Sequence, residues 1–130
     1  MRKELIDNNP FLKLSFEFSL FVIEYCDNLE AEKKFVISRQ LVKSGTSIGA
    51  NAMEAQNAES KADFIHKIKI AAKEADETQY WLLLCDYSKQ YPECKELLLK
   101  VEELNKIMGK ILSTAKRKTP LSFIISFFIF

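Results

Sequence analysis

Histidine is the scarcest catalytic residue type in this sequence of 130 residues, which contains only His66. A single imidazole excludes every site that needs two, including di-iron bundles built on paired Glu-x-x-His motifs and zinc proteases with an H-E-x-x-H motif. Glycine and proline are nearly as rare, with three of each. So few helix breakers, together with 28% charged residues, favour a mostly helical globular protein over a barrel or sandwich.

Long apolar runs and paired cysteine spacings are also missing. No run reaches the roughly 18 apolar residues that a membrane-spanning helix needs, and the first ten residues lack the apolar core of a secretory signal. The three cysteines, Cys26, Cys85 and Cys94, are an odd number without C-x-x-C spacing, which is typical of buried thiols in a reducing compartment. We therefore expect a cytoplasmic protein.

The periodicity predicts an all-α fold. With 19 basic and 18 acidic residues, the net charge is +1, which argues against a histone-like polycation and against an acidic disordered chaperone. The length allows one domain. Apolar residues recur at helical spacing in four segments, over about residues 10–28, 33–57, 61–90 and 92–115. Their short connections favour an antiparallel up-down four-helix bundle over residues 1–115, followed by a tail at 116–130.

The first helical segment is apolar on two opposed sides. One stripe should pack inside the bundle: Phe11, Leu14, Phe18, Phe21 and Tyr25. The other projects from the opposite side: Leu12, Phe16, Leu20 and Ile23. A helix of a small monomer needs only one buried stripe, so we interpret the second stripe as an oligomer interface.

The middle of the second segment is short of bulky side chains. Gly45 and Gly49 each lower helix stability by about 1 kcal/mol relative to alanine. We therefore expect a compensating role: without side chains, they allow another helix or subunit to approach closely. A phosphate-binding loop is the alternative, but the stretch lacks the Lys-Ser/Thr pair of a P-loop and no strand precedes it. The pattern favours packing.

Basic residues on the second and third helical segments are the candidate nucleic-acid-binding positions. They are Arg39, Lys43, Lys67, Lys69 and Lys73. Such residues could bind phosphates, and repetition around an oligomer would add their potentials. The alternative is a solvated face neutralised by neighbouring acidic residues.

Polar residues near the apolar stripes predict a buried network that fixes the register of two helices. Its members are Asn51, Glu54, Glu74 and Glu77. A carboxylate metal site from the same residues has no further support, and we predict no metal and no cofactor. Tyr80 and Trp81 are interpreted as interfacial or core anchors, with RNA stacking as the weaker alternative.

Ser60 and Asp63 form a capping-box-like start for the third segment. Asp63 and His66 are three residues apart, so their side chains can contact each other on a helix. In a hydrolytic enzyme, these two residues and Glu77 would be the catalytic candidates. Without a nucleophile or a cleft, we predict no catalytic residues.

The tail differs from the rest of the chain. A basic triplet, Lys116 to Lys118, is followed by Thr119, Pro120 and an uncharged apolar run that ends at Phe130. This run could dock on the bundle, touch a membrane surface, or be a fortuitous extension of the reading frame. We expect no membrane contact.

The stretch from Arg39 to Ala55, R-Q-L-x-x-S-G-T-S-I-G-A-N-x-x-E-A, resembles the central motif of the four-helix-bundle family encoded within 23S rRNA intervening sequences. The blocks D-F-I-H-K at 63–67, K-E-A at 73–75 and E-T-x-Y-W-L at 77–82 continue the resemblance in order. It covers about residues 10–115.

The resemblance implies an up-down bundle that assembles into a ring-shaped homopentamer. The fold is also similar to the accessory variability protein of diversity-generating retroelements, a basic pentamer that engages RNA and a reverse transcriptase. It implies no catalytic residues and no small-molecule substrate. The expected partners are further copies of the chain and structured RNA or a ribonucleoprotein; a protein-interaction scaffold without nucleic acid is the alternative.

Overall fold

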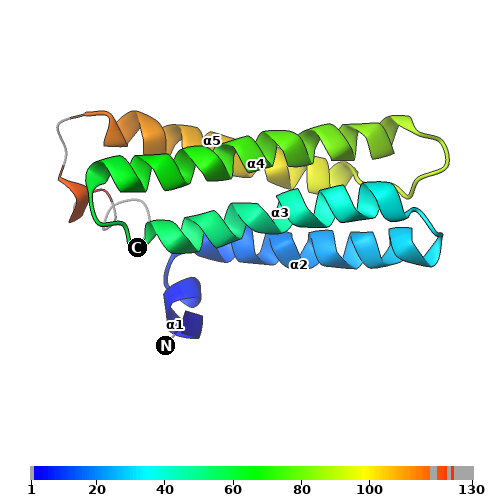
Figure 1. Cartoon of the computed structure of the whole chain (residues 1–130), viewed down its shortest axis with the longest axis horizontal. Helices are drawn as coiled ribbons and strands as arrows, with labels where there is room; N and C mark the ends of the chain where they lie inside the picture. The colour runs from blue at the N-terminus through cyan, green and yellow to red at the C-terminus, as the bar shows by residue number, and fades with distance from the viewer. Residues whose placement is uncertain (1, 118–119, 123, 125–130) are drawn as a thin grey trace.

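The computed structural model describes residues 2–117, 120–122 and 124, and the fold is all-α as predicted. Its helices are α1 (Arg2–Asp7), α2 (Pro10–Ala31), α3 (Phe35–Ala55), α4 (Lys61–Tyr87) and α5 (Lys95–Ala115). Four of them, α2 to α5, run side by side along the long axis, each antiparallel to the next in sequence, while α1 projects from the start of α2 (Figure 1). The short α1 was not predicted.

Helices α2 and α4 start at Pro10 and Lys61 and α5 ends at Ala115 as predicted, and the other predicted boundaries are two or three residues off. Helix α2 continues past residue 28 to Ala31, because it ends in a Schellman motif. The amide of Lys34 donates to the carbonyl of Leu29 at 2.8 Å, and that of Lys33 donates to Glu30 at 2.9 Å. Lys33 takes the left-handed conformation, with φ 62°, that glycine usually supplies at this position. Helices α3 and α4 end earlier than predicted, and α5 starts at Lys95 rather than at residue 92.

Two predicted helix starts are confirmed by their hydrogen bonds. The Asn9 side chain accepts from the Leu12 amide at 3.1 Å, and Pro10 occupies the first helical position. At the start of α4, the Ser60 hydroxyl accepts from the Asp63 amide at 3.0 Å, and the Asp63 carboxylate accepts from the Glu59 amide at 3.1 Å. The bonds from the Leu12 and Asp63 amides satisfy donors that the start of a helix leaves unpaired.

The two glycines of α3 bring this helix close to α2. A Cβ atom built on Gly45 would lie 2.8 Å from Cγ1 of Val22, and one on Gly49 would lie 3.3 Å from the carbonyl oxygen of Ser15. Neither distance leaves room for a methyl group without movement. The packing interpretation is therefore confirmed, and the partner is α2 of the same chain.

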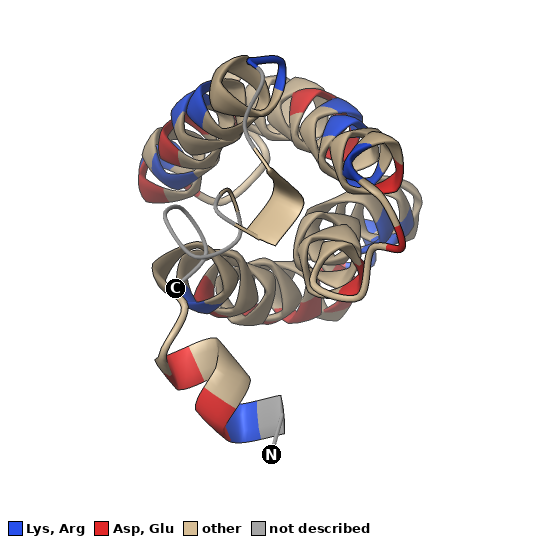
Figure 2. Ribbon diagram, turned by 90° about the vertical axis from the view of Figure 1, so that its left-hand side faces the viewer, with Lys and Arg blue, Asp and Glu red and all other residues tan. Residues whose placement is uncertain are grey.

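The start of the tail docks on the bundle. Ile124 is fully buried in the core, and Leu121 packs against the same core. The amide of Ile124 donates to the carbonyl of Pro120, and the Lys61 ammonium donates to the carbonyl of Arg117. Viewed along the bundle, this segment lies between the helix ends (Figure 2). The rest of the predicted apolar run falls outside the described residues.

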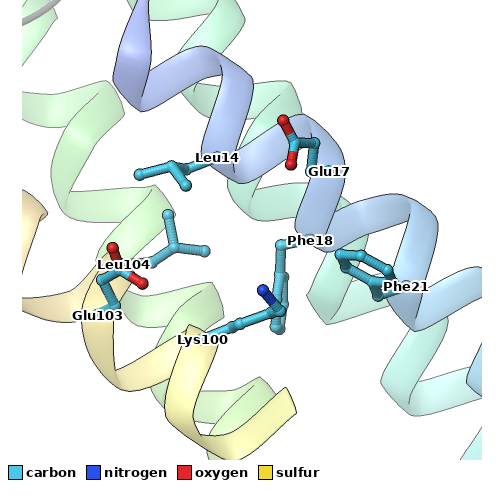
Figure 3. A pocket seen from close by; sticks show the side chains of 7 residues that line it. All are labelled: Leu14, Glu17, Phe18, Phe21, Lys100, Glu103 and Leu104. Carbon is cyan, nitrogen blue, oxygen red and sulfur yellow. The ribbon is translucent and has the colours of Figure 1, made fainter. Parts of the chain in front are cut away.

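The seam between α2 and α5 is more open than the other seams between neighbouring helices of the four-helix bundle. Leu14 and Phe21 of α2 border this seam together with Lys100 and Leu104 of α5 (Figure 3). Both α2 residues are exposed, so their predicted place inside the bundle is wrong. The physical reason is that α5 stays at a distance on this side, and the Lys100 ammonium lies over the Phe21 ring, 5.1 Å from its centroid.

The end of the bundle away from the tail contains the three cysteines, which are all free thiols and all buried. The Tyr25 hydroxyl donates to the carbonyl of Pro92 at 2.7 Å and so joins α2 to the loop between α4 and α5. Burial raises the pKa of Cys26 and of Cys94 to about 11 and also raises the pKa of Cys85. All three thiols are therefore protonated at neutral pH.

Candidate functional site

An apolar groove lies on the outside of α2, where the sequence predicts an exposed apolar stripe. Phe16, Leu20 and Ile23 line it and are 40%, 53% and 41% exposed. Ile6 of α1 forms one wall, and Gly49, Ala50 and Met53 of α3 lie along another. The groove has a volume of about 380 Å³. We call it the α2 groove; an exposed apolar surface of this kind is typical of an interaction site.

Leu12 does not belong to the exposed part of this surface. It lines the α2 groove but is only 2% exposed and belongs mainly to the core, so its place at an oligomer interface stays a prediction. The close approach of α3 at Gly45 and Gly49 covers this flank of α2, which moves Leu12 into the core.

The five predicted basic positions separate into two groups. Arg39, Lys43, Lys69 and Lys73 are exposed, and none of them forms an ion pair within the described part of the chain. Lys67 instead pairs with Glu54 of α3 at 3.1 Å. Basic and acidic residues are interleaved along the helices rather than gathered into one stripe (Figure 2).

Lys43 lies close enough to the acidic residues of α4 to influence one of them. Partial burial raises the pKa of the Glu74 carboxyl, the neighbouring Glu77 raises it further, and Lys43 opposes both effects. The surface between α3 and α4 therefore carries both signs of charge.

The predicted buried polar network does not form. Asn51 donates to the carbonyl of Ser47 in its own helix at 2.8 Å, Glu54 pairs with Lys67, and the Glu77 carboxylate accepts from the indole of Trp81 at 3.2 Å. A smaller polar contact joins the two helices instead: the Thr78 hydroxyl of α4 donates to the Ser44 hydroxyl of α3 at 2.9 Å. Both hydroxyls are buried.

The residues of the enzyme alternative do not converge. The Asp63 carboxylate caps α4, the Glu77 carboxylate bonds to Trp81, and His66 is exposed. Within residues 2–117, 120–122 and 124, no three His, Cys, Asp or Glu side chains are grouped so that they could hold a metal ion. None of the described helices is both long enough and apolar enough to cross a bilayer.

A family model described as "23S rRNA-intervening sequence protein" matches residues 7–110. This match spans α2, α3, α4 and most of α5. The chain belongs to the 23S rRNA-intervening sequence protein family. The motif from Arg39 to Ala55 that resembles this family includes Gly45 and Gly49, so part of the motif is explained by the contact between α2 and α3.

A solved structure is similar to this family member over most of its length. It is a 1.70 Å crystal structure of a protein of unknown function from the S23 ribosomal protein family of Bacteroides thetaiotaomicron VPI-5482. The two chains are 40% identical, with a TM-score of 0.75, and the match covers 78% of this chain and 97% of that chain. No curated protein matches this chain.

Two features of the site were missed from the sequence. The wall that α1 adds to the α2 groove comes from six residues before an Asn-Asn-Pro junction, too few to show a periodic pattern of their own. The Ser44–Thr78 contact joins two small polar residues on apolar stripes, where serine and threonine usually bond within their own helix. Both residues lie on the inner apolar stripes of their helices, and this position could have predicted the contact.

Proposed function

We propose that this chain is a non-enzymatic protein that assembles into a ring-shaped homopentamer and binds structured RNA or a ribonucleoprotein in the cytoplasm. The pentamer is the assembly that the sequence resemblance implies. The observation that carries the proposal is the α2 groove, which leaves three large apolar side chains uncovered on one copy of the chain.

Assembly would increase the positive electrostatic potential that the scattered basic residues produce. One copy has a net charge of +1, and its four exposed unpaired cations are separated by acidic neighbours. A ring repeats these cations around its circumference, and the potentials of symmetric copies add. The exposed positions Arg39, Lys43, Lys69 and Lys73 are therefore the candidates for phosphate contacts. Lys67 is a weaker candidate because its partner Glu54 neutralises it.

The assembly is tested by sedimentation velocity and native mass spectrometry of the full chain. We expect a species of five copies for the wild type. Replacing Phe16 and Ile23 by glutamate places charges in the α2 groove and should give a folded monomer of 15.0 kDa. A matched control, Leu99→Glu, changes an exposed leucine of α5 outside the groove. It should leave the pentamer intact. A wild-type monomer at micromolar concentration, or a pentamer that survives both glutamates, would contradict the proposal.

RNA binding is tested by filter binding of a structured rRNA fragment across a salt series. Replacing Lys69 and Lys73 by glutamine should weaken binding and flatten its salt dependence, because each lost phosphate contact lowers the slope. Lys106→Gln is the control, since Lys106 lies on α5 and pairs with Glu102 at 3.7 Å. Absence of saturable binding by the wild type at low salt would refute the RNA role.

A protein-interaction scaffold with no nucleic-acid role is the second candidate. It is favoured by the mixed charges of the surface between α3 and α4, where Lys43 faces Glu74 and Lys67 pairs with Glu54. This candidate predicts that the protein purifies free of nucleic acid and retains one polypeptide partner at high salt.

A further inference from the structure

The solvent-exposed face of α4 carries lysines in the first half of the helix and tyrosines in the second half. At about 100° per residue, Lys69, Lys73, Tyr80 and Tyr87 lie within roughly 40° of one another around the helix axis. The first two are exposed cations that make no ion pair among the described residues. The other two are tyrosines that are 56% and 83% exposed.

One of the two exposed rings, that of Tyr80, is supported by a neighbouring ring. Tyr80 meets Trp81 edge-on, with the ring centroids 5.2 Å apart. Trp81 packs partly against the core and donates its indole N–H to Glu77. Tyr80 thus contacts a neighbour that is itself anchored, and it remains 56% exposed. A ring of this kind is ready to stack without further ordering.

We propose that this strip of α4 binds a single-stranded segment of RNA. Lys69 and Lys73 contact phosphates, and unpaired bases stack on Tyr80 and Tyr87. The inference rests on the proposed RNA-binding function and specifies the site and the state of the RNA. Positive charge beside exposed aromatic rings is the combination that binds single strands, because phosphates need cations and every base has a face that stacks.

Acidic residues limit the electrostatic share of this binding. Glu77 lies about 40° from Lys73 around the helix, and Asp76 lies about 60° to the other side. Both repel phosphates, so the rings should supply most of the affinity. Two phosphate contacts on a single strand predict a slope of about −1.4 for the logarithm of the association constant against that of the salt concentration.

The experiment measures fluorescence anisotropy of the full chain with two labelled probes, a short oligouridylate and an RNA duplex of equal length. Tyr80→Leu and Tyr87→Leu should each weaken oligouridylate binding by about fivefold or more and leave duplex binding unchanged. Tyr87→Phe keeps the ring and should bind like the wild type. The double variant Lys69→Gln, Lys73→Gln should flatten the salt dependence for both probes.

The outcomes separate this inference from the proposed function. Wild-type affinity in both leucine variants, with weaker binding by the lysine variant, would overturn the stacking role and leave RNA binding standing. A loss of assembly in the leucine variants, without a specific loss of single-strand binding, would make the strip a protein contact and also overturn the inference. No binding of either probe, nor of a structured rRNA fragment, by the wild type would refute both.

Discussion

At the scale of single residues, the glycines show how local space decides the effect of one methyl group. Gly45 and Gly109 both lie inside helices, in α3 and α5. A Cβ on Gly45 would meet Val22 at 2.8 Å, whereas one on Gly109 would meet nothing within 4 Å. The two positions therefore form a matched pair in which helix propensity is the same and packing differs.

We expect Gly45→Ala to lower the free energy of unfolding by about 1–2 kcal/mol, because the steric penalty in a close-packed contact exceeds the propensity gain. Gly109→Ala should raise the free energy of unfolding by about 0.5–1 kcal/mol. Urea denaturation followed by circular dichroism measures both. The double variant Val22→Ala, Gly45→Ala should be less destabilised than the sum of the two single variants, because the shorter side chain removes the steric contact. Equal gains at the two glycines would show that the contact between α2 and α3 is loose.

Glu74 makes stability depend on pH. Its pKa is raised in the folded chain, mainly by burial, so the native state holds this proton more tightly than the unfolded state does. The stability linked to this group is present below the ordinary glutamate pKa of 4.5 and is lost as pH rises through the folded-state value. We expect Glu74→Gln to be more stable than the wild type at pH 7, with the difference shrinking as pH falls through the raised folded-state pKa and lost below the ordinary value.

The measurement for Glu74 is chemical denaturation of both proteins across this pH range. Glu102→Gln serves as the control, since it removes only an exposed ion pair with Lys106 on α5. It should change stability by about 0.5 kcal/mol or less. A constant difference between wild type and Glu74→Gln at every pH would contradict the assigned titration.

At the scale of elements, the start of the tail stabilises the end of the bundle. Ile124 is fully buried although it lies beyond the residues that the family model matches. We expect Ile124→Ala to cost about 2–4 kcal/mol of unfolding free energy, the usual range for an isoleucine truncated in a core. Val36→Ala, at an exposed position of α3, should change stability by about 0.5 kcal/mol or less. Thermal and urea denaturation of the two variants give the comparison, and equal stability would show that the tail does not hold the core.

The four long helices could be predicted from the sequence because their apolar residues repeat at the helical period. The end of α2 could not, since it depends on Lys33 in a conformation that a lysine rarely adopts. The inner face of α2 was also only partly predictable. Leu12 is buried while Leu14 and Phe21 are exposed, because α3 approaches closely at its glycines and α5 does not.

The candidate site was predictable to the same degree. Phe16, Leu20 and Ile23 were identified because an apolar stripe without an internal partner is visible in the sequence alone. The pairing of Lys67 with Glu54, and the separate partners of Asn51 and Glu77, were not. Long polar side chains can reach several neighbours, and which one they reach depends on the register of α3 against α4.

At the scale of the whole molecule, assembly and stability should be linked. If copies associate through the α2 groove, the native state is favoured by mass action, and the unfolding midpoint should rise with protein concentration. A chain carrying Phe16→Glu should unfold at a midpoint independent of concentration. Differential scanning fluorimetry over a dilution series measures this, and a wild-type midpoint that stays constant would argue against association in solution.

The three buried thiols, at the end of the bundle away from the tail, can report on local unfolding, because they react only when they become exposed. Cys26 comes from α2, Cys85 from α4, and Cys94 directly precedes α5, so that three separate parts of the chain must come apart before an alkylating reagent reaches all of them. Because each thiol is protonated at rest, modification waits for exposure. The order in which the three react would therefore trace the sequence in which the helices separate, without any probe being added to the chain.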